Sequence, residues 1–243
     1  MTGGGIGSPS ELVRWEPGCR RSESPAQTMS HSGMSERKRT HPARERLRLV
    51  GLRSTLAGPF DLAVGSGECV VITGPSGSGK SLLLRLIADL DPGEGEVLLD
   101  GRARQSVAAP EWRRRVGYAA AEPGWWGETV AEHFPPPLRP EARVLAARLA
   151  LPPNCLEAPL MQLSTGERQR LALVRLLVRN PPVLLLDEPT AALDQVATEL
   201  VETLLLERLA TGVCLLWVTH SLQQAERVGS RRLKMHERRL LTA

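Results

Sequence analysis

The chain is 243 residues long, with 42% hydrophobic and 24% charged residues, which is enough to bury the core of one α/β domain with an insertion. Its formal net charge of +4 lies mostly at the N-terminal end: residues 1–46 hold eight Lys/Arg against five Asp/Glu, whereas residues 47–243 hold 23 against 22. This nearly neutral folded part argues against a broad nucleic-acid-binding face, and no apolar run approaches the ~18 residues of a membrane-spanning helix.

Residues 1–45 are expected to form a disordered basic tail, because Gly, Ser, Pro and Arg dominate them and apolar periodicity is nearly absent. The first residues lack the apolar core of a secretory signal. The four cysteines of the chain form no close pair, which favours reduced thiols and argues against a zinc site. We therefore expect the folded domain to span residues 46–243.

Short apolar segments at the start of the domain predict strands. Residues 47–52 and 60–64 are expected to form an antiparallel pair. A third strand is expected over residues 68–73, where β-branched and apolar residues follow one another. A helix is expected over residues 81–88, so the chain passes from a buried strand through a glycine-rich loop into a helix.

The loop between that strand and that helix reads Gly-Pro-Ser-Gly-Ser-Gly-Lys-Ser, which is the spacing of a phosphate-binding loop. Its glycines allow consecutive backbone N–H groups to point at phosphate oxygens, and the dipole of the following helix favours negative charge at its N-terminus. Lys80 would place a positive charge on the outer phosphates, and Ser81 would offer a hydroxyl ligand to Mg²⁺. The expected phosphate-binding residues are Gly74, Pro75, Ser76, Gly77, Ser78, Gly79, Lys80 and Ser81.

Beyond this loop, strands are expected over residues 96–101 and 116–119. A stretch interrupted by prolines follows, with a helix-like run at 141–150, and it predicts an inserted helical subdomain at about residues 122–180. Helix and strand then alternate over residues 166–179, 183–187, 197–209 and 213–219. This alternation favours an α/β fold, with a mainly parallel sheet in a P-loop NTPase core, an antiparallel β subdomain and the inserted α-helical subdomain.

Two adjacent carboxylates, Asp187 and Glu188, end the apolar strand predicted at residues 183–187. A carboxylate at the C-terminal end of a buried strand lies on the ligand side of an open α/β sheet, so Asp187 is a candidate Mg²⁺ ligand together with Ser81. Glu188 is a candidate base or orienter for an attacking water. Alone, the pair would fit an ordinary polar turn equally well, but the phosphate-binding loop favours the chemical interpretation.

Residues 163–167, Leu-Ser-Thr-Gly-Glu, lie upstream of the carboxylate pair and directly before a predicted helix. In order and spacing they resemble the signature sequence of ABC-type ATPases, and the resemblance covers residues 47–240. Residues 189–194 are similar to the loop with which members of that family communicate across their dimer. His220, at the end of the strand predicted over 213–219, resembles the switch histidine of the family.

The resemblance implies a head-to-tail homodimer in which ATP on the phosphate loop of one copy is capped by the signature helix of the other. Ser164 and the backbone N–H of Gly166 would then meet the γ-phosphate at a helix N-terminus, where free donors and the dipole favour anions. The implied catalytic residues are Glu188, His220 and Lys80. The implied cofactors are ATP and Mg²⁺.

Several departures from the family pattern bear on this expectation. Thr165 and Glu167 stand where the signature usually has glycine and glutamine. Ala121 stands where the family usually has a glutamine that helps to bind Mg²⁺ and senses the membrane partner, so either water or Glu122 must substitute or the coupling to that partner is altered. The aromatic residue that usually stacks on adenine is missing, with Leu52 in its place, which predicts weak discrimination between ATP and GTP.

With no membrane-spanning segment expected, the resemblance implies a separate transmembrane permease subunit, no nucleic-acid partner and a peripheral location at the cytoplasmic face of the inner membrane. Within the family, the short helical insertion and the segment ending in Thr219 and His220 look most like small bacterial FetA-like ATPases, which implies metal (iron) export. Two alternatives stay open. One is a non-transport ABC ATPase, and the other is a nucleotide-binding regulatory module with impaired hydrolysis, suggested by Ala121.

Overall fold

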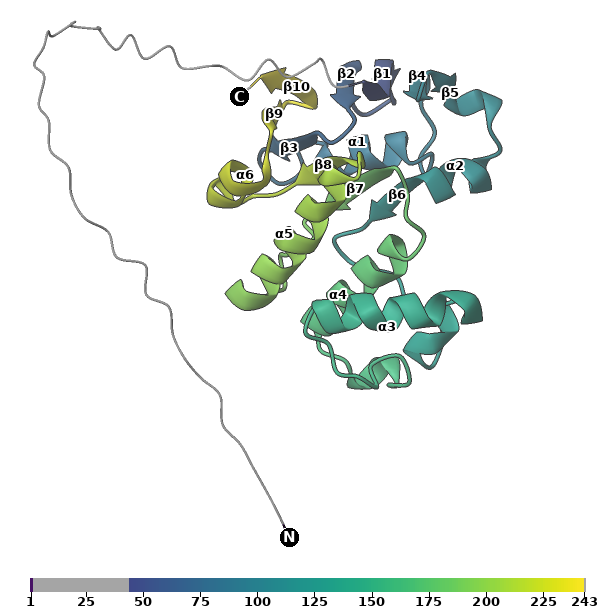
Figure 1. The fold of residues 1–243 in the computed structure, drawn as a ribbon. Helices are drawn as coiled ribbons and strands as arrows, with labels where there is room; N and C mark the ends of the chain where they lie inside the picture. The colour runs from purple at the N-terminus through teal and green to yellow at the C-terminus, as the bar shows by residue number, and fades with distance from the viewer. Residues whose placement is uncertain (2–43, 243) are drawn as a thin grey trace, which may run out of the picture. The chain divides into compact units, whose positions relative to one another are not determined.

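The computed structural model describes Met1 and residues 44–242, and residues 44–242 form a folded α/β domain (Figure 1). The tail expected over residues 1–45 therefore lies outside the described residues, except at its end. There Ser66 donates a backbone hydrogen bond of 2.8 Å to the carbonyl of Arg44, and Glu45 already begins the first strand. The first strand thus begins one residue before the predicted boundary at residue 46.

The N-terminal part of the domain forms a four-stranded antiparallel sheet in the order β2-β1-β4-β5. Leu47 and Leu49 of the first strand are buried while their neighbours face outward, which is the alternation of a strand with one face on the core. The antiparallel pair expected at the start of the domain is present. The strand bounds are β1 Glu45–Arg53, β2 Phe60–Gly65, β4 Glu94–Leu99 and β5 Arg102–Ala103.

The larger sheet has six strands in the order β10-β9-β3-β8-β7-β6, and all pairs except β9 with β10 are parallel. This confirms the mainly parallel sheet. The hairpin β9–β10 was not predicted from the sequence. Its apolar pattern consists only of Leu233 and Met235, and charged residues that face outward lie before and between them. The strand bounds are β3 Cys69–Thr73, β6 Val116–Ala119, β7 Val183–Asp187, β8 Cys214–Val218, β9 Arg231–His236 and β10 Arg239–Thr242.

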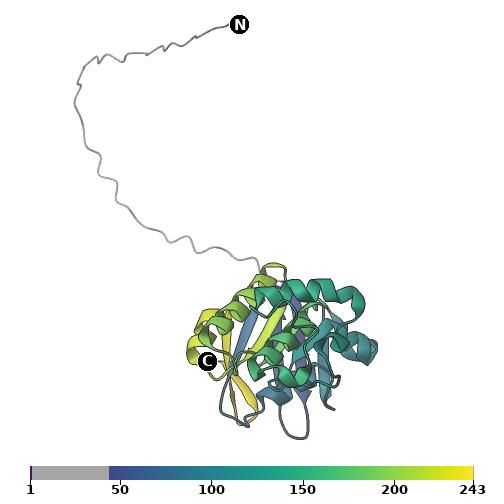
Figure 2. The same cartoon turned by 90° about the horizontal axis from the view of Figure 1, so that it is seen from below.

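Helices cover both faces of the larger sheet. Successive residues of its strands alternate between two buried clusters: Val70 and Ile72 pack with α1 and the smaller sheet, and Val71 packs on the side of α5 and α6. Seen from below, the teal and green helices α3 to α5 lie in front of the strands (Figure 2). The helix bounds are α1 Lys80–Ile87, α2 Ala109–Arg115, α3 Arg139–Arg148, α4 Thr165–Leu177, α5 Gln195–Ala210 and α6 Leu222–Val228.

The segment between β6 and β7 corresponds to the helical insertion expected at about residues 122–180. Arg139 begins α3 two residues before the predicted start, because Pro140 fits the first turn of a helix. Three short 3-10 helices accompany α3 and α4, at Val130–His133, Pro136–Leu138 and Leu160–Gln162. Thr129 and Pro159 form an isolated β-bridge that joins the segment before α3 to the segment before α4.

Candidate nucleotide-binding site

The phosphate loop connects β3 to α1 with the backbone geometry that its glycines permit. Gly74, Gly77 and Gly79 have φ values of 151°, 74° and 105°, which L side chains rarely adopt. A Cβ atom on Gly74 would lie 2.3 Å from the carbonyl oxygen of Met235, so only glycine fits between the loop and β9. Ser78 Oγ is buried without a hydrogen-bond partner, an orphaned donor that a phosphate oxygen would satisfy.

Lys80 is the first residue of α1 and lies folded against the loop with only 6% of its surface exposed. Its Nζ donates hydrogen bonds of 2.8 Å and 2.9 Å to the carbonyls of Gly74 and Pro75. Burial lowers the pKa of Lys80, while the nearby carboxylates of Glu188 and Asp187 act in the opposite direction. The ammonium group therefore closes the loop and still has an N–H for a phosphate oxygen.

Asp187 is the last residue of β7 and is 3% exposed. The hydroxyl of Tyr118, on the neighbouring strand β6, donates a 3.0 Å hydrogen bond to Asp187 Oδ2, and burial together with that carboxylate raises the pKa of Tyr118. Among the described residues there is no group of three or more His, Cys, Asp or Glu that could hold a metal ion. Mg²⁺ needs no such group, since it is commonly held by one or two carboxylates, waters and substrate phosphates, so Asp187 and Ser81 suit it.

Glu188 follows directly and has a left-handed backbone with φ of 48°, a strained conformation for a residue with a side chain. Burial raises the pKa of Glu188, while His220 and Lys80 oppose that rise. His220 Nε2 lies 3.1 Å from Glu188 Oε1, yet Oε1 has no aligned hydrogen bond. The arrangement places a half-buried carboxylate with one unsatisfied oxygen beside Asp187, which is what a base for an attacking water needs.

Gln169 holds this strained residue in place and was not among the predicted site residues. It lies on α4, is 4% exposed, and its Nε2 donates a 2.8 Å hydrogen bond to the carbonyl of Glu188. Its Oε1 accepts a 3.2 Å hydrogen bond from the backbone N–H of Ala192. The spacing to Leu173 and Leu177 could have revealed it, because these three residues recur on one buried helix face and only one of them is polar.

The loop that follows Glu188 is also held from α6. Gln224 Nε2 lies 2.9 Å from both Thr190 Oγ1 and Glu202 Oε1, and Glu202 in turn pairs with Arg227 at 2.8 Å. Gln224 and Glu202 are both buried, so this polar group is satisfied within the protein. Asp194 then caps α5 by accepting a 2.8 Å hydrogen bond from the N–H of Ala197.

Ser164 is the N-cap of α4 and forms a capping box with Glu167. Ser164 Oγ accepts a 3.2 Å hydrogen bond from the Glu167 N–H, and the Glu167 carboxylate accepts a 2.9 Å hydrogen bond from the Ser164 N–H. These hydrogen bonds lower the pKa of Glu167. The glutamate that departs from the family pattern thus has a structural role, since a capping box accepts either Glu or Gln at that position.

The structure does not bring all predicted residues together within one chain. Lys80, Asp187, Glu188 and His220 meet at the carboxyl ends of the parallel strands. Within the described part of the chain, the side-chain hydrogen bonds of Ser164 and the bond to the Gly166 carbonyl stay within α4, and none reaches the phosphate loop. Leu52, which stands at the place of the adenine-stacking aromatic, is fully buried in β1 and cannot face a base.

A sequence model of the ABC transporter family matches residues 58–191. Protein STAR1 of rice is 37% identical over 213 residues, covering 81% of this chain and 62% of that protein. The probable iron export ATP-binding protein FetA of Escherichia coli is 36% identical over 66% of this chain and 76% of its own length. The thiamine import ATP-binding protein ThiQ of Yersinia pseudotuberculosis is 39% identical over 74% of this chain and 81% of its own length.

Solved structures agree. A bacterial Atm1-family ABC exporter with ATP bound superimposes with a TM-score of 0.72 at 26% identity, covering 81% of this chain and 38% of the exporter. A dimeric ATP-binding cassette in a post-hydrolysis state, bound to ADP and Pi, gives 0.71 at 26% identity, covering 80% of this chain and 96% of that one. The chain thus spans less than two thirds of some relatives and most of others. It belongs to the ABC transporter family, as an ATP-binding and ATP-hydrolysing domain of that family.

Proposed function

We propose that this domain hydrolyses ATP to power transport through a separate membrane subunit. The observation that carries the proposal is the cluster of Lys80, Asp187, Glu188 and His220 around the phosphate loop. No helix among the described residues has the length and hydrophobicity to cross a membrane, so a membrane path must come from another chain or from a part of the protein not described. The proposal also places the domain at the cytoplasmic face of the inner membrane, bound to that subunit.

Each residue of the cluster has a distinct task in the proposal. Lys80 and the backbone N–H groups of residues 74–81 hold the phosphates of ATP, and Ser81 and Asp187 hold Mg²⁺. When bound, Mg²⁺ neutralises charge on the phosphates. Glu188, with its raised pKa, accepts a proton from the attacking water, and His220 holds the Glu188 carboxylate in position.

The proposal includes a head-to-tail homodimer. Ser164 and Gly166 stand at the exposed N-terminus of α4, where backbone donors and the helix dipole favour an anion. Because their hydrogen bonds with side chains stay within α4, these residues are available to the nucleotide of a second copy. The similar ATP-binding cassette that is dimeric with ADP and Pi bound supports the pairing of two copies.

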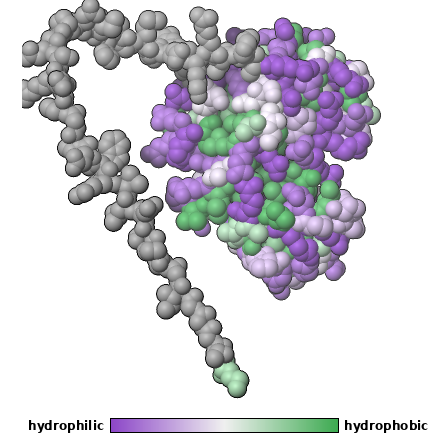
Figure 3. Space-filling model, in the orientation of Figure 1, coloured by the Kyte–Doolittle hydropathy of each residue, from purple (hydrophilic) through white to green (hydrophobic). Residues whose placement is uncertain are grey.

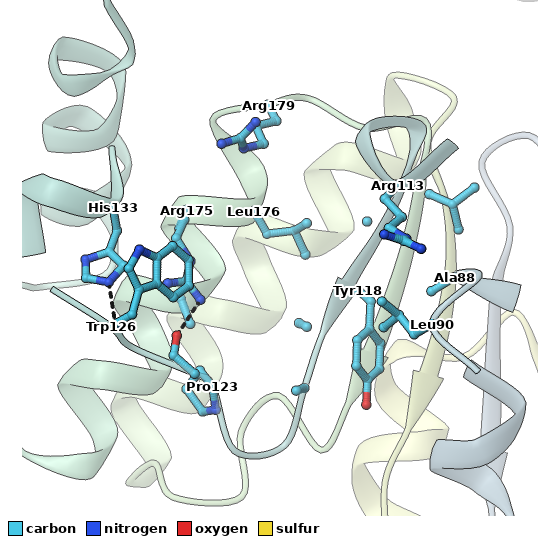
Figure 4. A pocket seen from close by; sticks show the side chains of 16 residues that line it. Ala88, Leu90, Arg113, Tyr118, Pro123, Trp126, His133, Arg175, Leu176 and Arg179 are labelled. Carbon is cyan, nitrogen blue, oxygen red and sulfur yellow. Dashed lines mark hydrogen bonds between the residues drawn. The ribbon is translucent and has the colours of Figure 1, made fainter. Parts of the chain in front are cut away.

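The membrane subunit is proposed to dock at a cavity of about 340 Å³ between β6 and the helical insertion (Figure 4). Arg175 lies 4.4 Å and 5.0 Å from the ring centres of Trp125 and Trp126 and donates a 3.0 Å hydrogen bond to the carbonyl of Gly124. The Trp126 side chain is 76% exposed. In the space-filling view, hydrophobic side chains gather across the middle of the visible face of an otherwise hydrophilic surface (Figure 3).

Trp126→Ala should therefore uncouple the domain from its membrane subunit. We expect binding to that subunit to weaken about 30-fold, the effect of truncating a central aromatic anchor, with the turnover of the isolated domain unchanged. Pull-down of the membrane subunit and phosphate release, measured side by side, check this. Met161→Ala is the matched control, because Met161 is 94% exposed and does not line the cavity. If both variants retain the membrane subunit equally well, the subunit docks at a surface other than this cavity.

Gln169→Leu tests the support of Glu188, since it keeps the size of the side chain and removes both of its hydrogen bonds. We expect kcat to fall about tenfold with KM nearly unchanged, and the free energy of unfolding to fall by about 1–3 kcal/mol for the unpaired backbone groups. Steady-state phosphate release and chemical denaturation measure the two effects. Gln223→Leu, at an exposed position of α6, should change neither. A loss of stability without a loss of kcat would make Gln169 purely structural.

Iron export is proposed for the cargo because of the FetA-like resemblance, while the relative that imports thiamine is equally similar. The path of the transported substrate lies in the membrane subunit, so identifying that subunit would identify the substrate. The test of the whole proposal is to purify the full chain with its membrane partner, reconstitute both in vesicles, and measure phosphate release and metal transport together. Nucleotide binding with only background phosphate release would instead support a regulatory module.

A further inference from the structure

Two segments far apart in the chain form a wall beside the phosphate loop. One is the loop after β1, with Leu56, and the other is the turn between β9 and β10, with Arg238. Leu56 is 57% exposed, so its apolar side chain is available for contact with a ligand. The wall and the second half of the phosphate loop enclose a cavity of about 300 Å³, lined by Leu56, Gly77, Gly79, Lys80, Ser81, Leu82 and Arg238.

The turn that carries Arg238 is strained. His236 pairs with Arg239, so only Glu237 and Arg238 connect the two strands, and their φ values are 46° and 61°. Turns with two positive φ values strongly prefer Asn-Gly or Gly-Gly, because L side chains are disfavoured there. Glycine at this position would relieve the backbone strain, so the presence of a long charged side chain there indicates that the side chain has a function.

Arg238 is fastened to the loop after β1 by its side chain and its backbone. Its Nη1 donates a 2.8 Å hydrogen bond to the carbonyl of Leu56, and its carbonyl accepts a 3.2 Å hydrogen bond from the Gly58 N–H. A Cβ atom built on Gly79 would lie 3.7 Å from both Cα and Cγ of Arg238. The guanidinium group is therefore held beside the phosphate loop and keeps further N–H donors and its flat faces.

We propose that Leu56 and Arg238 form the binding surface for the base of the bound nucleotide. This inference rests on the proposed nucleotide-binding function. The cavity adjoins the second half of the phosphate loop as well as Ser81 and Leu82, so a nucleoside whose phosphates lie on the loop can reach it. A flat cation and an exposed apolar side chain suit the faces of a purine, so the guanidinium group takes the place of the missing aromatic residue.

The proposal also determines base selectivity. Stacking on a guanidinium face and packing on a leucine use the π-face of the base, which adenine and guanine share, and not the edge that distinguishes them. Arg238 should therefore contribute equally to the binding of ATP and GTP. It should contribute nothing to a ligand that has phosphates and no base.

The experiment titrates the full chain with ATP, GTP and inorganic tripolyphosphate, each with Mg²⁺, for the native protein, Arg238→Gly and Arg238→Lys. Arg238→Gly relieves the backbone strain, so Tm should stay the same or rise. Its affinity for ATP and for GTP should nevertheless fall about fivefold to tenfold, the fold-change expected for a cation–π contact, with tripolyphosphate unaffected. Arg238→Lys keeps the charge and loses the flat group, and should lose affinity for ATP and GTP as well.

Three results with the variants would overturn the inference. Weaker binding of tripolyphosphate by Arg238→Gly would show that Arg238 contacts the phosphates instead of the base. Full ATP affinity in Arg238→Lys would show that charge alone matters. If Arg238→Gly binds ATP as tightly as the native protein does, Arg238 does not bind the base, and the proposed function is unaffected. Failure of the native protein to bind any nucleotide would instead remove the proposed function itself, and the inference with it.

Discussion

Lys80→Ala is expected to weaken ATP binding about 100-fold and to abolish phosphate release. Lys80 combines two functions in one buried side chain, since its Nζ closes the phosphate loop on Gly74 and Pro75 and supplies the positive charge nearest the outer phosphates. Loss of charge-assisted hydrogen bonds of about 3 kcal/mol in total corresponds to the 100-fold effect. Calorimetric titration with ATP and Mg²⁺, followed by a phosphate-release assay, measures both losses.

The matched control is Lys234→Ala, which removes an exposed lysine from β9 and leaves the loop intact. Its ATP affinity and turnover should match those of the native protein. Thermal unfolding must accompany the titration, because two loop carbonyls lose their partner in Lys80→Ala and some stability will be lost. If Lys80→Ala bound ATP normally while folded, the loop would hold phosphates by its backbone alone and the role given to Lys80 would be wrong.

The phosphate loop could be predicted from the sequence because its geometry is local. Three glycines, one lysine and the change from strand to helix specify the backbone within eight consecutive residues, 74–81. The carboxylates at the end of β7 were predictable for a similar reason, since a buried parallel strand presents its carboxyl end to the ligand side. Both features depend on short stretches of chain, and the structure has them where the sequence places them.

Features that depend on contacts between distant segments could not be predicted in this way. Leu52 and Leu56 are close in sequence, yet β1 turns the first into the core and leaves the second beside the phosphate loop. Arg238 reaches that same cavity from the far end of the chain, through a hairpin whose apolar pattern is only two residues long. The spacing of Gln169 to Leu173 and Leu177 marks it as a buried residue of α4, but its hydrogen bonds to Glu188 and Ala192 follow only from the packing of β7 and its following loop against α4.

Glu188→Gln is expected to bind ATP with nearly native affinity and to lower kcat at least about 100-fold, the contribution of a positioned general base. The amide has almost the shape of the carboxylate, so the left-handed backbone at φ 48° and the hydrogen bond from Gln169 should survive. What is lost is the ability to accept a proton from water. Steady-state phosphate release gives kcat, and a titration with ATP gives the affinity.

The same variant also tests the shared site. If Ser164 and Gly166 of a second copy cap the nucleotide, ATP that is bound and not hydrolysed should hold two copies together, because closure then has no chemical step to reverse it. Light scattering after size exclusion should show a dimer of Glu188→Gln with ATP and a monomer without it. Glu141→Gln, an exposed position on α3, is the control and should neither slow turnover nor accumulate dimer. Slow turnover without a dimer would support Glu188 as the general base and contradict the site shared with a second copy. Normal turnover would mean that another group accepts the proton.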